Sequence, residues 1–231
     1  MPQATVQAIL DHAYSTPCYA SSAISQSDPS LGFYYHEKSA AEKALGRRIA
    51  LARYLNTAAL CPAIEKLQSD PVLLEIAAKY LDAKPVHQGN RLYWNFATEL
   101  TRQEKSATAC MFHYDVDDYR CLKFFFYLTN VDEFGGPHVC VRGSHQKKKL
   151  QHFLLRKREE DQDIIDYYGI KAVETICGQP GYGFVEYPLC FHKATVPMRQ
   201  DRLLLQVQYA RNDYGILHDT TAAQSQMIQL S

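Results

Sequence analysis

The 231-residue sequence lacks an excess of charge of either sign, because 25 Lys and Arg residues face 25 Asp and Glu residues. A chain without a net field is not drawn as a whole to nucleic acid or to an anionic membrane surface. The lysine run at 147–149 is short and typical of a solvated loop or helix start. We therefore expect a small-molecule substrate and neither a nucleic-acid nor a membrane partner, while the oligomeric state stays open.

Long apolar runs are also missing. No stretch approaches the roughly 20 apolar residues that cross a bilayer. The first residues, Met-Pro-Gln-Ala, show neither the basic nor the apolar region of a signal peptide. The sequence thus predicts a soluble, cytoplasmic protein.

The seven cysteines include no Cys-x-x-Cys pair. An odd number without paired spacing argues against both a disulfide framework and a structural zinc site. Cys110, Cys121, Cys140 and Cys190 lie in apolar runs, where a thiol usually packs as a small hydrophobe.

Repeats, low-complexity tracts and linkers are absent as well, so residues 1–231 are expected to form one domain. Residues 1–90 are predicted to be mainly helical and to pack on a barrel. Ser39 can cap a helix that continues to Leu55, and Asp70-Pro71 is a typical cap followed by proline at the first helical position.

Residues 91–214 show short aromatic and β-branched runs separated by Gly, Asp and Asn, which is typical of sequential strands. A charged insert at 148–168 has the apolar spacing of a helix. This pattern predicts a mainly β fold with flanking helices, specifically a double-stranded β-helix, the cupin-like jelly roll. The predicted strands are 92–97, 107–114, 121–129, 138–141, 172–177, 183–187 and 202–211.

Three residues form a candidate metal site. His113 and Asp115 are two positions apart at the end of an apolar run, so in a strand they point to the same side. His192 follows a later strand-like run. Two imidazoles and one carboxylate can occupy one face of an octahedron and leave the other open, which suits Fe(II) that also receives an oxoacid and O₂. Alone, a His-x-Asp pair is more often turn chemistry or a satisfied core group.

Arg202 opens the apolar run 203–207, which would bury its guanidinium. A buried charge needs a partner, and the distal carboxylate of 2-oxoglutarate offers a bidentate one. The alternative is an arginine that reaches the rim or pairs near Asp201. Arg199 is a competing anchor, but Pro197 beside it is typical of a loop.

Several motifs follow one another along the second half of the chain: His113-Tyr114-Asp115, the run 122–131, Gly135-Gly136-Pro137-His138, Arg142-Gly143-Ser144-His145, Phe191-His192-Lys193-Ala194 and Arg202. Over roughly residues 91–214, their order and spacing resemble the phytanoyl-CoA dioxygenase family of Fe(II)/2-oxoglutarate-dependent oxygenases. The resemblance implies a jelly-roll core, Fe(II) held by His113, Asp115 and His192, and Arg202 as the co-substrate anchor. It places His138 and His145 outside the ligand set.

Two positions bear on how far the resemblance extends. Ala194 stands where family members often carry a hydroxyl residue that helps the arginine hold the carboxylate. Lys123, in an otherwise apolar strand, is the candidate replacement donor, and a lysine facing water at a sheet edge is the alternative. Asp115 is retained, whereas a halogenating member would carry a small residue there, so the resemblance favours hydroxylation.

The substrate contacts suggested by position are Trp94, Asn95 and Arg120, which flank the metal motif. Trp94 has the alternative role of packing the sheet on the helices. Arg156, Lys157 and Arg158 in the insert either meet an anionic substrate or form a solvated helix face.

Together these features predict an oxygenase that hydroxylates a small metabolite in a biosynthetic pathway, using Fe(II), 2-oxoglutarate and O₂ and releasing succinate and CO₂. One alternative is a cupin-like metalloenzyme that needs no oxoacid and has no use for Arg202. Another is a non-catalytic binding protein of the same fold.

Overall fold

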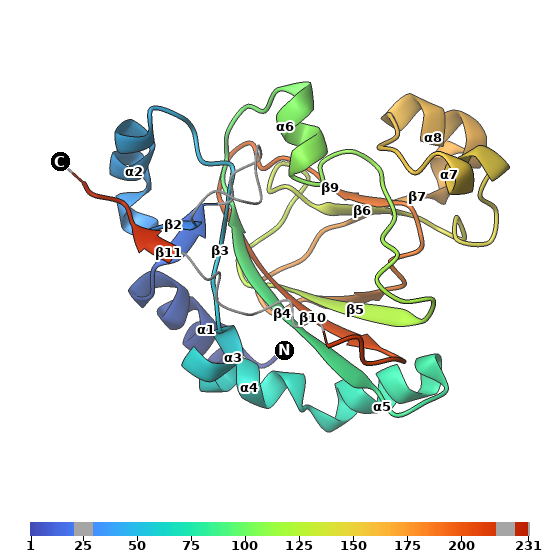
Figure 1. Cartoon of the computed structure of the whole chain (residues 1–231), viewed down its shortest axis with the longest axis horizontal. Helices are drawn as coiled ribbons and strands as arrows, with labels where there is room; N and C mark the ends of the chain where they lie inside the picture. Colours follow the sequence, from blue (N-terminus) through green and yellow to red (C-terminus); the bar gives the residue numbers. More distant parts are fainter. Residues whose placement is uncertain (21–29, 216–224, 231) are drawn as a thin grey trace.

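The computed structural model describes residues 1–20, 30–215 and 225–230, and its strands form two sheets that face each other (Figure 1). The large sheet has the strand order β11-β2-β1-β3-β4-β10-β5-β8, and the small sheet has the order β7-β6-β9. The fold is the predicted double-stranded β-helix with flanking helices. The strands are β1 Cys18–Ala20, β2 Ser30–Phe33, β3 Leu51–Arg53, β4 Val86–Asn95, β5 Cys121–Tyr127, β6 His138–Val141, β7 Val173–Ile176, β8 Gly183–Glu186, β9 His192–Ala194, β10 Arg202–Ala210 and β11 Ser225–Met227.

The two faces of strand β10 differ in character, since one packs into the hydrophobic core and the other carries buried polar side chains. It is buried along its whole length and pairs antiparallel with β4 on one side and β5 on the other. Leu203, Leu205 and Val207 join the main hydrophobic core, because alternate side chains leave a strand on the same face. Arg202 and Gln206 have the opposite parity and therefore point between the two sheets. The site is built on that inner face.

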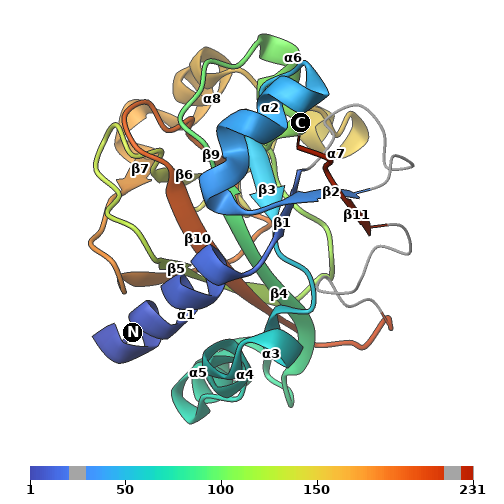
Figure 2. The same ribbon diagram turned by 90° about the vertical axis from the view of Figure 1, so that its left-hand side faces the viewer.

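Helices cover the outer face of the large sheet, where α1, α3, α4 and α5 lie together (Figures 1 and 2). Among the described residues, no helix combines the length and the apolar character that crossing a membrane requires. The helical segments are α1 Gln3–Ser15, α2 Lys38–Leu45, α3 Thr57–Leu60, α4 Pro62–Gln68, α5 Pro71–Leu81, α6 Arg102–Ala107, α7 Leu150–Leu154 and α8 Asp161–Tyr168, with short 3-10 turns η1 Tyr35–Glu37 and η2 Ile170–Ala172.

Two helices were predicted in the N-terminal region, and the structure confirms the start of the second but not the length of the first. Asp70 caps α5 as predicted, since its side chain accepts a hydrogen bond of 2.8 Å from the amide of Val72. The longer helix predicted from Ser39 to Leu55 is wrong. Ser39 lies inside α2, which ends where Gly46 adopts a left-handed conformation with φ of 62°. The residues beyond it return as β3, which pairs with β4.

The region 1–90 also contributes more strand than predicted. β1, β2 and β3 extend the large sheet, and β4 begins at Val86 rather than at Leu92. The first half of β4 is polar in sequence and lacks the alternating apolar pattern that would predict a strand. Its backbone is nevertheless paired along β10, with a bulge between Gln208 and Tyr209.

The strand predicted at 107–114 is wrong for most of its length. Helix α6 occupies its start, because Thr101 and Glu104 form a capping box that satisfies the first amides of the helix. Ala109 then turns the chain with φ of 60°. Only Phe112 and His113 make isolated antiparallel bridges, to Glu159 and His192 respectively.

Candidate metal centre and adjoining cavities

Backbone hydrogen bonds hold the three predicted metal ligands in one place. His113 and His192 exchange a pair of them, with N–O distances of 3.0 and 2.8 Å, so the two segments run side by side. The amide of Asp115 donates to the carbonyl of Pro188 at 2.8 Å, which ties the loop after His113 to the chain before β9. The structure thereby brings His113, Asp115 and His192 together, with one potential ligand atom from each lying within 4.8 Å of the others.

The orientation of the two imidazoles suits a metal ion. Nδ1 of His113 lies 2.9 Å from the carbonyl of Met111, and Nδ1 of His192 lies 3.0 Å from the carbonyl of Cys190. Because a carbonyl only accepts, each Nδ1 donates, and a neutral ring then carries its lone pair on Nε2. The Nε2 atoms lie 3.8 and 3.6 Å from the two oxygens of Asp115. Two such nitrogens and one carboxylate are a donor set that fits Fe(II).

Burial and neighbouring charges shift the ionisation of all three side chains. Burial, reinforced by the neighbouring His192, lowers the pKa of His113 to about 3, so this imidazole is neutral at pH 7. Burial alone would raise the pKa of Asp115, but the neighbouring His192 and the charge of Lys123 hold it far below its usual range. Burial lowers the pKa of His192, and the carboxylates of Glu186 and Asp115 outweigh that effect and raise it.

Lys123, the candidate second donor to the co-substrate, contacts the candidate metal ligand Asp115. It is buried in the interior strand β5, so the alternative of a sheet edge facing water is wrong. Its Nζ lies 2.5 Å from Asp115 and 3.1 Å from Asp117. In the sheet, Lys123 of β5 lies opposite Gln208 of β10. Arg202, the first residue of β10, lies six residues before Gln208, about 20 Å away along the backbone. The structure therefore sets Lys123 against the candidate metal ligand rather than beside Arg202.

Glu186 is a site residue that the sequence reasoning missed. Its carboxylate is buried between two imidazoles, with oxygens 3.1 Å from Nδ1 of His192 and 2.7 Å from Nε2 of His138. A carboxylate behind a metal-binding histidine orients the ring and strengthens the ligand. The signal in the sequence was a lone glutamate in an otherwise apolar strand. His138 faces the other carboxylate oxygen of Glu186, not the one that contacts Nδ1 of His192, as its 2.7 Å contact shows.

Arg202 is fully buried at the start of β10, with 1% of its surface exposed. It donates to the side-chain oxygen of Asn95 at 2.6 Å and to the carbonyl of Gly136. Both partners are neutral, and within the described part of the chain no carboxylate pairs with this guanidinium. Asp201, the alternative partner, accepts from the amide of Ala97 at 2.8 Å instead. The competing Arg199 is exposed, with its guanidinium 3.7 Å from the ring centre of Phe134.

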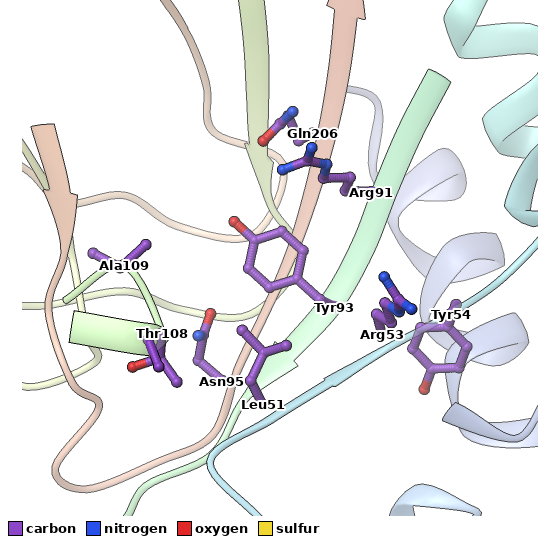
Figure 3. A pocket seen from close by; sticks show the side chains of 11 residues that line it. Leu51, Arg53, Tyr54, Arg91, Tyr93, Asn95, Thr108, Ala109 and Gln206 are labelled. Atoms are coloured by element: carbon purple, nitrogen blue, oxygen red, sulfur yellow. The ribbon is translucent and has the colours of Figure 1, made fainter. Parts of the chain in front are cut away.

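A cavity of about 380 Å³ opens beside Asn95 (Figure 3). Figure 3 shows Tyr93 and Arg91 rising from β4, Gln206 from β10, and Ala109 on the far side. The wall also contains Ala194, where a hydroxyl residue is common in the family that the sequence resembles. Asn95 thus both borders this cavity and holds the buried Arg202.

Two of the predicted substrate contacts lie elsewhere. Trp94 points to the outer face of β4, where its ring stacks on Tyr35 at 4.2 Å and its Nε1 donates to the hydroxyl of Tyr54 at 2.9 Å. Packing between sheet and helices, the alternative role, is the one the structure shows. Arg120 donates to the carbonyl of Leu81 at 3.2 Å and so caps the end of α5. Both side chains are occupied by structural contacts away from the triad.

No protein-family model matches the chain, and no curated protein matches it in sequence. Solved structures do match. HygX from Streptomyces hygroscopicus, with nickel and 2-oxoglutarate bound, is 14% identical with a TM-score of 0.60, covering 92% of this chain and 80% of HygX. SnoN, a non-haem α-ketoglutarate-dependent epimerase from nogalamycin biosynthesis, is 12% identical with a TM-score of 0.56, covering 100% and 87%. AviO1 from Streptomyces viridochromogenes Tue57 is 14% identical with a TM-score of 0.55, covering 94% and 87%.

At these identities the likeness establishes a common fold. The chain is therefore a double-stranded β-helix protein that shares its architecture with HygX, SnoN and AviO1. Within that fold it gathers two histidines and an aspartate at the junction of the sheets, with a buried, charge-unbalanced arginine at the start of β10.

Proposed function

We propose that this protein is an Fe(II)- and 2-oxoglutarate-dependent oxygenase that hydroxylates a small molecule. The observation that carries the proposal is the convergence of His113, Asp115 and His192, with both Nε2 atoms turned toward the carboxylate. Neighbours of the same fold support it, since HygX has been crystallised with 2-oxoglutarate and nickel and also with hygromycin B.

In this proposal the three side chains hold Fe(II) and leave the remaining coordination positions to the oxoacid and O₂. When bound, iron, 2-oxoglutarate and O₂ supply an oxidation in which one oxygen atom enters a substrate C–H bond and the other enters succinate, with loss of CO₂. The protein's own part is to keep His113 neutral, keep Asp115 ionised and position the substrate in a largely buried site.

Arg202 is the proposed anchor of the co-substrate. Its guanidinium is already oriented by Asn95 and Gly136, and its positive charge has no carboxylate partner among the described residues. A planar guanidinium can bind a carboxylate through two parallel hydrogen bonds. A cupin-like enzyme without an oxoacid would leave this buried charge unexplained, which favours the oxoacid-dependent reaction.

The test is an anaerobic titration of the purified protein, first with Fe(II) and then with 2-oxoglutarate, followed by visible absorption. We expect a weak metal-to-ligand charge-transfer band that requires both additions. The band should be lost in Arg202→Ala at the same oxoacid concentration and kept in Arg199→Ala, the matched change at an exposed arginine. Bound iron without a band would move the assignment to an oxoacid-independent metalloenzyme, and absence of iron binding would favour a non-catalytic protein.

A further inference from the structure

The segment between α7 and α8 is not the continuous helix that the sequence suggested. Residues 155–160 are not helical, and the amide of Glu159 donates to the carbonyl of Phe112 at 2.9 Å. This is an antiparallel bridge, so the residue before Glu159 lies next to the residue after Phe112. The bridge thus carries Arg158 alongside His113, a candidate metal ligand. The solvated helix face is excluded for this basic segment.

A second cavity, of about 390 Å³, opens between this segment and the triad. Its lining consists of the motif His113, Tyr114 and Asp115 on one side and Arg156, Lys157 and Arg158 on the other. The cavity beside Asn95 is lined by none of the three candidate ligands. A substrate that reaches the proposed iron through the cavity lined by His113, Tyr114 and Asp115 therefore passes the basic residues 156–158.

The positive charge of this segment is only partly balanced. Lys157 pairs with Glu159 at 3.4 Å. Arg156 donates to the carbonyl of Tyr114 at 3.2 Å, and its guanidinium lies 5.6 Å from the ring centre of the same tyrosine. Arg158 is half-buried and forms no ion pair or hydrogen bond with any residue in the ranges 1–20, 30–215 and 225–230.

The opposite wall of this cavity carries the carboxylate of Asp115. That carboxylate is already paired with the ammonium of Lys123 at 2.5 Å. Arg158 also lines a third cavity, of about 430 Å³, together with Arg102. Arg102 forms an ion pair with Glu160 at 2.5 Å. Arg158 thus lines both cavities and is attracted by the charge of Asp115, yet it forms no ion pair or hydrogen bond with any described residue.

We propose that the substrate carries an oxyanion, a carboxylate, phosphate or sulfate group, and that Arg158 assisted by Arg156 binds it beside the metal. This proposal rests on the proposed function and names the class of its substrate. Guanidinium groups match the planar edge of an oxyanion and bind it most strongly where water is excluded. Two arginines, two positions apart in the segment 155–160, can hold the anion and aim the rest of the substrate at the triad.

The test uses acetate, inorganic phosphate and sulfate as probes of the protein loaded with Fe(II) and 2-oxoglutarate without O₂. We expect at least one anion, compared with chloride at equal ionic strength, to shift the charge-transfer band without abolishing it. Arg158→Gln should keep the band and weaken the anion's apparent affinity at least tenfold, since hydrogen bonds between charged groups are worth about 1.5–3 kcal/mol. Arg47→Gln, the same change at an exposed arginine, should behave as the parent does. The strongest binder identifies the head group.

Calorimetric titration of the same anions into the protein, with and without Fe(II), reads binding independently of the band. Equal affinity for the parent and Arg158→Gln would overturn the inference, as would anions that erase the band by displacing 2-oxoglutarate at Arg202. Loss of the band in Arg158→Gln would also overturn it, because Arg158 would then hold the co-substrate. Absence of any band in the parent instead counts against the proposed function, and calorimetry still decides the anion site.

Discussion

Glu186 and His192 form a buried pair in which a carboxylate oxygen lies 3.1 Å from Nδ1, the ring nitrogen that faces away from Asp115. We predict that Glu186→Gln weakens Fe(II) affinity about 10- to 100-fold, because removing the charge behind a ligating histidine loosens its orientation and lowers its basicity. Competition with a chromogenic chelator measures this. Glu174→Gln, at a pair exposed on the surface, should leave the affinity unchanged; equal affinities for all three proteins would remove Glu186 from the site.

How much of this centre the sequence could predict depends on how local its signals are. His113 and Asp115 are two residues apart, so one strand-like segment suffices to place them together. His192 and Arg202 were recognisable because each adjoins an apolar run. Glu186 carries no motif of its own, and only the pairing of β5 with β8 brings its strand behind His192.

The errors in the fold have two origins, one local and one long-range. The segment at 107–114 has strand-like composition, but helix α6 extends to Ala107, and Ala109 then turns the chain with φ of 60°. The segment at 155–160 lies in a region of helical spacing, yet its backbone bonds to Phe112, more than forty positions away. The polar first half of β4 is held in the sheet by its neighbour β10 rather than by its own pattern. In the last two cases long-range pairing overrode local propensity.

A second prediction concerns the charge of Lys123. Its ammonium lies between Asp115 and Asp117, so Lys123→Met leaves two carboxylates without their buried cation. We expect the metal-free variant to lose about 3–5 kcal/mol of unfolding free energy, the usual cost of breaking a buried pair. Fe(II) or Co(II) should restore more stability to the variant than to the parent, because the metal supplies the missing positive charge.

Thermal unfolding followed by circular dichroism, with and without metal, measures this difference. Lys79→Met is the matched control, since Lys79 pairs with Glu75 in solvent and such pairs contribute little. A Lys123→Met protein as stable as the parent in the absence of metal would contradict the role of Lys123 as a counter-charge.

A third prediction separates the charge of Arg202 from its position. Asn95→Asp should keep the contact at 2.6 Å while converting it into an ion pair. The guanidinium is then neutralised, so we expect the apparent affinity for 2-oxoglutarate to fall at least tenfold, about 1.4 kcal/mol or more, with little loss of stability. Titration of the charge-transfer band gives the affinity. Asn130→Asp supplies the control, and unchanged oxoacid binding in Asn95→Asp would place the co-substrate away from Arg202.

The last prediction tests the structural role of Trp94, the chain's single tryptophan. Its indole is 1% exposed, stacks on Tyr35 and donates to Tyr54, so Trp94→Ala empties a large volume between β4 and the helices. We expect the free energy of unfolding to fall by about 3–5 kcal/mol, as for other buried aromatic truncations. Because the ring lies on the opposite face of the strand from Asn95, Fe(II) and 2-oxoglutarate affinities of the folded variant should match those of the parent.

Urea unfolding followed by circular dichroism measures the stability. Tyr119→Ala, at an exposed aromatic residue, is the control and is expected within about 0.5 kcal/mol of the parent. An unchanged stability of Trp94→Ala combined with weakened oxoacid binding would instead assign Trp94 to the site.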